Sequence, residues 1–223
     1  MITDKIKIKI EKILNAIETG TPDGDYSNIS LYDDGPNQIK QITYGKSQTT
    51  EWGNLSKLVN LYILKNGQYA DQLRKYQDKI GRITLVHETD LIDILKAAGK
   101  DPVMIEAQDE FFDDHYWKPA FNWFSEKKFT LPLSMLVIYD SFIQSGSMLK
   151  FLRDKFPETT PVNGGDEKIW ISQYVKARHE WLSNHSQKIL VNSSYRTKAL
   201  LDAIAKENWE LEDQYCVNDC KIS

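Results

Sequence analysis

The sequence predicts an α+β protein that is mainly α-helical and carries one small hairpin-bearing segment. In several stretches, apolar residues recur every three or four positions, which is the period of a helix that buries one face. Residues 25–46 are instead rich in Tyr, Ser, Asp, Gly and Pro. No internal repeat and no composition shift typical of a flexible linker is visible. We therefore expect residues 1–223 to form a single domain with two lobes.

The first predicted helix covers residues 3–18. Thr3 and Asp4 offer a cap for its start, and Gly20 stops it. Glu18 directly follows the last apolar residue of its buried face. That face consists of Ile6, Ile10, Ile13, Leu14 and Ile17.

The following segment predicts two short strands and then the start of a helix. β-like residues gather at 27–32 and at 38–44, on either side of a turn-rich stretch. Thr49 and Thr50 then precede Glu51, which we expect to cap or open the next helix.

Helical periodicity dominates the rest of the chain. The stretch 131–146 is strongly apolar and is expected to be the central buried helix. Beyond Trp209 the pattern is unclear. Other helices are expected at about 67–79, 89–98, 101–124, 167–183 and 193–207, and one more carries the stripe Leu55, Leu58, Val59 and Tyr62.

The composition excludes several classes of partner. The chain is 41% hydrophobic and 27% charged, within the range of an ordinary globular protein. No apolar run approaches the roughly 18 residues that span a bilayer, so no membrane partner is expected. The N-terminus has no uninterrupted apolar core and no small-residue cleavage site, so no signal peptide is visible. The net charge of −4 argues against nucleic acid.

No cofactor or metal is expected. The chain has no phosphate-binding loop, no dinucleotide-binding glycine motif and no Gly-x-Ser-x-Gly elbow, and its histidines are scattered. Cys216 and Cys220 lie four residues apart, so they would share one face of a helix or form a small disulfide in a loose tail. Without a neighbouring histidine they do not indicate zinc.

Two carboxyls are the strongest candidates for chemistry. Glu18 adjoins buried side chains at the negative end of a helix, and both influences favour the protonated form that a general acid needs. Asp34 lies in a turn before Gly35, where a solvated carboxylate stays ionised and can act as a base. Asp33 competes for that role, and the plainer interpretations are a solvated helix-end glutamate and an ordinary turn aspartate.

Further residues could serve the same site. The hydroxyl of Thr43 could orient a water molecule, although β-propensity alone also explains it. Glu51 could contact a sugar by charge or hydrogen bond, with Asp33 nearby. Tyr32 and Tyr44 offer aromatic faces of the kind that stack on sugar rings, or they belong to the core.

The order of these residues resembles the chitosanases of glycoside hydrolase family 46, within the lysozyme-like superfamily. Glu18, Asp34 and Thr43 are similar in order to that superfamily's acid, base and water-positioning threonine. More specific matches follow along the chain. They are Asp101–Val103, Ala107–Asp109, Tyr139–Asp140, Gly164–Glu167 and Ala177–Arg178.

The resemblance implies a lysozyme-like two-lobed fold and an inverting hydrolysis, for which the two carboxyls stand about 6.5–9.5 Å apart. It implies Glu18 as proton donor, Asp34 as base and Glu51 as an acidic substrate contact. It also implies that Asp140 and Arg178 belong to a buried ion-pair network, with Arg196 tuning the acid.

The segment after Asp34 departs from the family, which leaves the substrate open. A Gly-Asp-Gly-Arg-Gly type stretch is replaced by residues 33–37. We expect a monomer that cleaves a β-1,4-linked amino-sugar polysaccharide, chitosan first, at an extracellular or periplasmic location. The alternatives are a peptidoglycan-cleaving muramidase and, in another class, an inactive carbohydrate-binding module.

Overall fold

The computed structural model describes residues 2–46 and 48–223. The chain divides into two compact units. The terminal unit combines the residues up to Pro22 with His115–Ser223, and the middle unit spans Asp23–Asp114. In the part of the chain that is described, no helix has both the length and the apolar character needed to cross a membrane.

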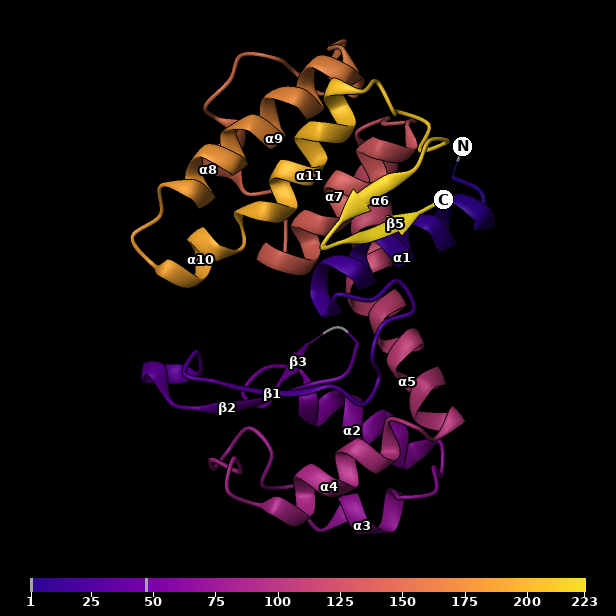
Figure 1. Ribbon diagram of the computed structural model, residues 1–223, viewed down its shortest axis with the longest axis vertical. Helices are drawn as coiled ribbons and strands as arrows, with labels where there is room; N and C mark the ends of the chain where they lie inside the picture. Colours follow the sequence, from indigo (N-terminus) through magenta and orange to yellow (C-terminus); the bar gives the residue numbers. More distant parts are fainter. Residues whose placement is uncertain (1, 47) are drawn as a thin grey trace. The chain divides into compact units, whose positions relative to one another are not determined.

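The terminal unit begins with helix α1, Asp4–Thr19, as predicted (Figure 1). The Thr3 hydroxyl accepts a hydrogen bond from the backbone N–H of Ile6, which satisfies one of the free donors at the helix start. Gly20 adopts φ 75° and ends the helix in the left-handed conformation that glycine tolerates best. Glu18 therefore lies in the last turn.

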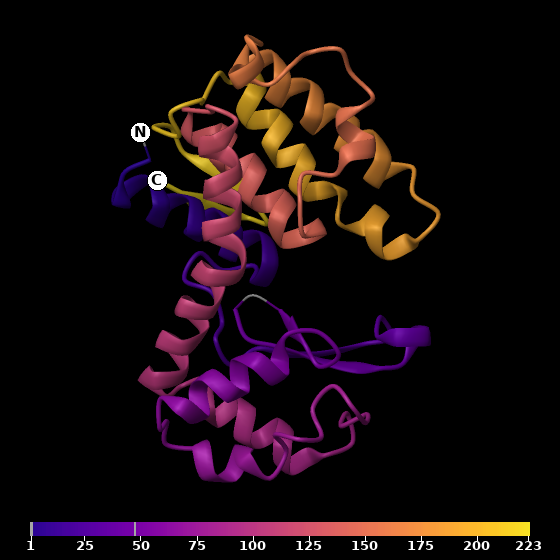
Figure 2. The same cartoon turned by 180° about the vertical axis from the view of Figure 1, so that it is seen from behind.

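The core of the terminal unit is built around α7, Pro132–Ser145. Every residue from Pro132 to Ser141 is buried, so the predicted central helix is confirmed. Helices α9, Glu167–Ser183, and α11, Ser194–Ala205, run side by side in both views (Figures 1 and 2). Asp166 caps α9 by accepting from the N–H of Ile169.

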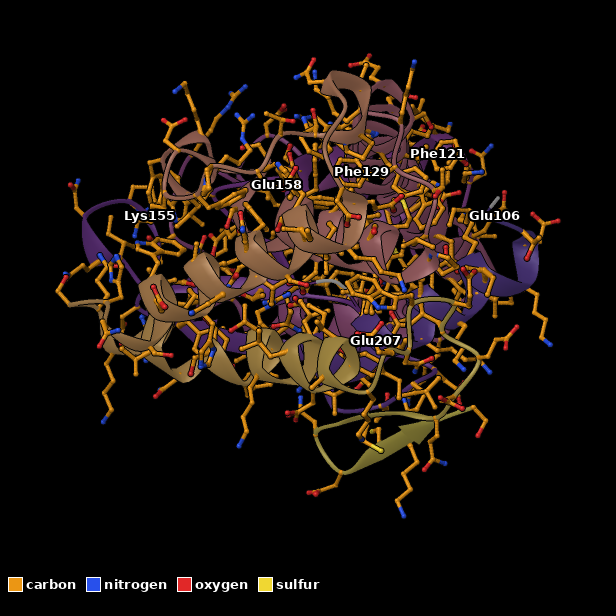
Figure 3. The ribbon with its side chains drawn as sticks, turned by 90° about the horizontal axis from the view of Figure 1, so that it is seen from above. Glu106, Phe121, Phe129, Lys155, Glu158 and Glu207 are labelled. Carbon is orange, nitrogen blue, oxygen red and sulfur yellow. The ribbon has the colours of Figure 1, made fainter. Side chains whose placement is uncertain are left out.

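Aromatic side chains fill the space between α9 and helix α6, Lys118–Glu126. Phe129, labelled in Figure 3, packs against Trp123 and edge-on against Trp170, with ring centroids 5.6 Å and 5.2 Å away. Trp170 also stacks on Tyr174. The remaining short elements of this unit are α8 Lys150–Arg153, the 3₁₀ turn Pro161–Asn163 and α10 Lys188–Asn192.

The helix expected over 101–124 is divided into three pieces. Helix α5 covers Pro102–Phe112, a π-helical stretch covers Asp113–Trp117, and α6 follows. Pro119 lies in the first turn of α6. Because proline has no N–H, it cannot donate the hydrogen bond that a continuous α-helix requires there.

The region beyond Trp209, for which no element was predicted, ends in a β-hairpin. Strands β4, Tyr215–Val217, and β5, Cys220–Ile222, pair antiparallel. The two turn residues, Asn218 and Asp219, have φ 48° and 62°, as a tight hairpin turn requires. Cys216 and Cys220 are free thiols on these strands, so neither the shared helix face nor the disulfide forms.

The middle unit contains a three-stranded antiparallel sheet in the order β1-β2-β3. The predicted strand regions contain β1 Ile29–Tyr32 and β2 Gln41–Tyr44, and Tyr32 pairs with Gln41. The 3₁₀ turn Pro36–Gln38 lies between them. Thr49–Thr50 form β3 rather than a helix start.

Helices complete the middle unit. Asp101 opens α5, because its carboxylate accepts a hydrogen bond from the N–H of Val103. It also accepts from the Tyr62 hydroxyl at 2.6 Å. The helix expected over 67–79 is shorter, because the chain turns after Arg74. The helices are α2 Leu55–Leu64, α3 Ala70–Arg74, α4 Thr89–Ala98 and α5 Pro102–Phe112.

Candidate active site

Glu18 is held at the end of α1 by an arginine from the other end of the chain. Its Oε1 accepts a hydrogen bond from Nη2 of Arg196 on α11 at 2.6 Å. The Glu18 side chain is 18% exposed, whereas that of Arg196 is 6% exposed. The carboxyl thus stays accessible while its partner is enclosed.

Arg196 is in turn held by Asp140 in the middle of α7. Oδ1 of Asp140 accepts from Nε and Nη2 of Arg196 at 2.9 Å and 2.7 Å. Oδ2 accepts from Nη1 of Arg178 on α9 at 2.5 Å. Asp140 is fully buried. The predicted buried ion pairs are therefore confirmed, and three helices converge on them.

The electrostatics of this cluster follow from its charges. Burial raises the pKa of Asp140, but Arg196 and Arg178 outweigh burial and hold it below its ordinary value. Burial lowers the pKa of Arg196, and Asp140 and Glu18 more than reverse that effect. With Glu18 ionised, two carboxylates balance two guanidiniums and the cluster is neutral.

Asp34 belongs to the middle unit and is exposed, in the turn that follows β1. Its Oδ1 accepts a hydrogen bond from Nε2 of Gln41 at 2.8 Å. Asp33 is exposed as well. The predicted solvent-exposed turn at Asp34 is therefore confirmed.

Thr43 lies in β2, two residues after Gln41. Its side chain is 3% exposed, and among the described residues its Oγ1 has no hydrogen-bond partner. Since side chains alternate along a strand, Gln41 and Thr43 point to the same face of the sheet, and Ile42 and Tyr44 to the other. A buried hydroxyl without a protein partner is suited to hold a water molecule.

Glu51 corrects two predictions. Helix α2 starts at Leu55 after Asn54, so Glu51 does not cap it. The Glu51 side chain is fully buried, with Oε2 accepting from the N–H of Ile42 at 3.0 Å and Oε1 from that of Leu85 at 2.7 Å. Burial raises the pKa of Glu51, and the two hydrogen bonds from backbone N–H groups lower it only in part. A carboxylate enclosed in this way ties the sheet to the following loop and offers no atom to a sugar.

The two tyrosines differ. Tyr44 is fully buried, so the predicted stacking on a sugar ring is wrong for it. Tyr32 is 48% exposed on β1 and keeps a free aromatic face. Because Tyr44 points away from the face that carries Gln41 and Thr43, the pleat of β2 explains its place in the core.

Glu18 belongs to the terminal unit, whereas Asp33, Asp34 and Thr43 belong to the middle unit.

Gln41 was not among the residues predicted from the sequence to serve the site. Its signal is a polar residue at an alternate position to Thr43 in an otherwise apolar strand. No group of three or more His, Cys, Asp or Glu side chains within 2–46 and 48–223 could hold a metal ion.

The fold is lysozyme-like, and comparison of the sequence with known families gives the class of protein as a glycoside hydrolase. A sequence model described as glycosyl hydrolase family 46 matches residues 12–214. This is most of the chain, so the chain belongs to glycosyl hydrolase family 46.

Named relatives agree with this assignment. A chitosanase of Bacillus subtilis (strain 168) is 26% identical over 220 residues, covering 91% of this chain and 77% of that protein. A mutant chitosanase of Bacillus subtilis MY002 complexed with 6 GlcN has a TM-score of 0.87 at 22% identity, covering 99% of both chains. The chitosanase of Gynuella sunshinyii with chitotetraose has a TM-score of 0.82 at 20% identity, covering 99% of this chain and 98% of that one.

Proposed function

We propose that this protein is an inverting endo-chitosanase with Glu18 as the general acid and Asp34 as the general base. The observation that carries the proposal is the Glu18–Arg196–Asp140 arrangement, in which a partly exposed carboxyl ends a buried chain of charges. A carboxyl in such a setting is the accessible member of an otherwise enclosed network, as a proton donor must be.

The charges of the network supply a reason for proton transfer. With Glu18 protonated, Asp140 faces Arg178 and Arg196 alone, and the cluster carries one net positive charge. When Glu18 gives its proton to the glycosidic oxygen, the cluster becomes neutral and Arg196 pairs with the new carboxylate. Arg196 is thus placed to pair with the carboxylate that proton donation leaves on Glu18.

The other half of the reaction uses the middle unit. Asp34 accepts a proton from a water molecule, whose oxygen attacks the anomeric carbon as the bond to the leaving oxygen breaks. The hydroxyl of Thr43 orients that water. Glu18 has lost one proton and Asp34 has gained one, so exchange with solvent restores both groups for the next cycle.

Chitosan is the proposed polymer because the named relatives are chitosanases and two of them were solved with glucosamine oligomers. Each glucosamine carries a cationic ammonium group. Asp23 and Asp33 are exposed carboxylates of the middle unit that could pair with it. The net charge of −4 suits the same substrate. We further propose a monomer acting outside the cell, where such polymers lie.

The test is a product assay on chitosan and on purified peptidoglycan, side by side. We expect chitosan oligomers whose first anomer, observed by proton NMR, is inverted. Glu18→Gln and Asp34→Asn should each abolish hydrolysis without lowering the melting temperature. Glu126→Gln and Asp78→Asn replace exposed carboxyls in the same two units and serve as controls. Activity retained by either site variant contradicts its role, and products from peptidoglycan alone contradict the substrate.

A further inference from the structure

Strand β2 places a buried amide beside the exposed carboxylate of Asp34. Gln41 is the first residue of β2, pairs with Tyr32 across the sheet and is 4% exposed. Burying a glutamine costs free energy unless both ends of its amide are hydrogen-bonded. Its two partners therefore indicate what the residue does.

Both ends of the amide are used. Oε1 of Gln41 accepts from the backbone N–H of Trp52 at 3.2 Å, and Nε2 donates to Oδ1 of Asp34 at 2.8 Å. A backbone N–H can only donate, so it fixes which end of the amide is the oxygen. The NH₂ group must then face Asp34, and a carboxylate is the partner that best accepts from it.

The turn that carries Asp34 is packed against the same residues. The N–H of Gly35 donates to the carbonyl of Ile39 at 3.0 Å, which closes the turn. A Cβ on Gly35 would lie 2.6 Å from that carbonyl oxygen and 3.2 Å from Cδ1 of Trp52. Only glycine therefore allows the turn to approach Trp52 and Gln41 so closely.

We infer that Gln41 is a positioning residue for Asp34, holding one carboxylate oxygen and leaving the other for the attacking water. The inference rests on the proposed role of Asp34 as base. A donor at Oδ1 fixes the rotation of the carboxylate and so sets where its other oxygen points. Thr43, on the same face of β2, lies on the side of the sheet where that water would be held.

Gln41→Glu separates this role from a structural one. The new carboxylate still accepts from the N–H of Trp52, but it cannot donate to Asp34 and adds a like charge beside it. We expect kcat to fall roughly 10- to 100-fold near pH 6, because a correctly ionised base contributes at least that much. KM should change little. The acidic limb of the kcat–pH profile should move to higher pH, and activity relative to wild type should recover as pH rises.

Gln41→Met is the second variant, since it keeps the length of the side chain and removes both hydrogen bonds. Gln72→Glu, an exposed change of the same chemistry in the middle unit, is the control and should leave the profile unmoved. If Gln41→Glu does not fold, the kcat–pH profile of Gln41→Met is the test of the inference instead. The inference is overturned if the folded variant keeps the acidic limb of the kcat–pH profile at its wild-type pH and loses kcat only in step with its melting temperature.

Asp34→Asn distinguishes the inference from the proposal on which it rests. If that variant keeps its activity, Asp34 is not the base and the proposed function fails first. If it is inactive while Gln41→Glu has wild-type kcat and pH profile, the function stands and only the role of Gln41 is wrong.

Discussion

Asp140 is the buried carboxylate that pairs with both Arg178 and Arg196 in the terminal unit. It has no exposed surface, and it accepts hydrogen bonds from two arginines that come from separate helices. A buried ion pair adds little stability over an apolar pair, but removing one partner leaves an uncompensated charge in the interior. The contribution of Asp140 is therefore best measured by its removal.

Asp140→Asn should destabilise the protein by about 3–5 kcal/mol at pH 7, the usual cost of breaking a buried ion pair. The folded pKa of Asp140 lies below its ordinary value of 3.8. Its stabilising effect is thus present above about pH 4 and is lost as pH falls through the folded pKa. Urea unfolding at pH 7 and pH 3 should show that the difference in the free energy of unfolding between wild type and variant is smaller at pH 3. Glu126→Gln is the control. A difference in the free energy of unfolding that is larger at pH 3 than at pH 7 would contradict the predicted direction of the pH effect.

At the scale of elements, the C-terminal hairpin completes the end of α1. The last carbonyls of a helix are short of partners within it, and that of Ala16 accepts one hydrogen bond there, from the N–H of Gly20 at 3.1 Å. Nδ2 of Asn218 donates to the carbonyl of Ala16 at 3.0 Å, and the Tyr195 hydroxyl donates to that of Ile17 at 2.7 Å. The Cys220 thiol donates to the carbonyl of Gly20 at 3.2 Å. Residues from two distant segments therefore hold the turn that carries Glu18.

Asn218→Gly should lower stability by roughly 1 kcal/mol, the net contribution of one neutral hydrogen bond. It should also lower kcat several-fold with KM little changed, because Glu18 is less firmly placed. Glycine keeps the positive φ of 48° at this position. Asp219→Gly makes the same backbone change at φ 62° and is the matched control. Equal losses of kcat in both variants would show that the turn, not the bond to α1, is responsible.

At the scale of the whole molecule, the chain leaves the terminal unit after Pro22 and returns at His115. The proposed acid comes from one unit, and the proposed base and water-positioning residue come from the other. We propose that the two units nevertheless fold as the single catalytic domain that the sequence predicts, since no linker-like composition separates them.

A single domain should unfold in one calorimetric transition. Asp140→Asn perturbs the terminal unit, and Glu51→Ala perturbs the middle unit by leaving two buried N–H groups unpaired, at about 1–3 kcal/mol each. Both variants should lower the midpoint of that same transition. Two transitions, each shifted by only one of the variants, would show that the units fold independently.

Features that depend on neighbours along the chain could be predicted from the sequence. Helix positions followed from the period of the apolar residues, the Thr3 cap and the Gly20 stop, because capping and amphipathicity act within a few residues. The order of the two acids and the later motifs sufficed for the family. The cores of the two first strands were also found this way.

Which of these side chains are accessible depends instead on how distant segments of the chain pack together. Glu51 and Tyr44 looked like substrate contacts but are buried, and Gln41 was passed over but reaches Asp34. Arg196 meets Glu18 across 178 positions, and Asn218 meets Ala16 across 202. Such partnerships depend on how distant segments pack, and the free energy of burying a charge or pairing it is fixed only once that packing exists.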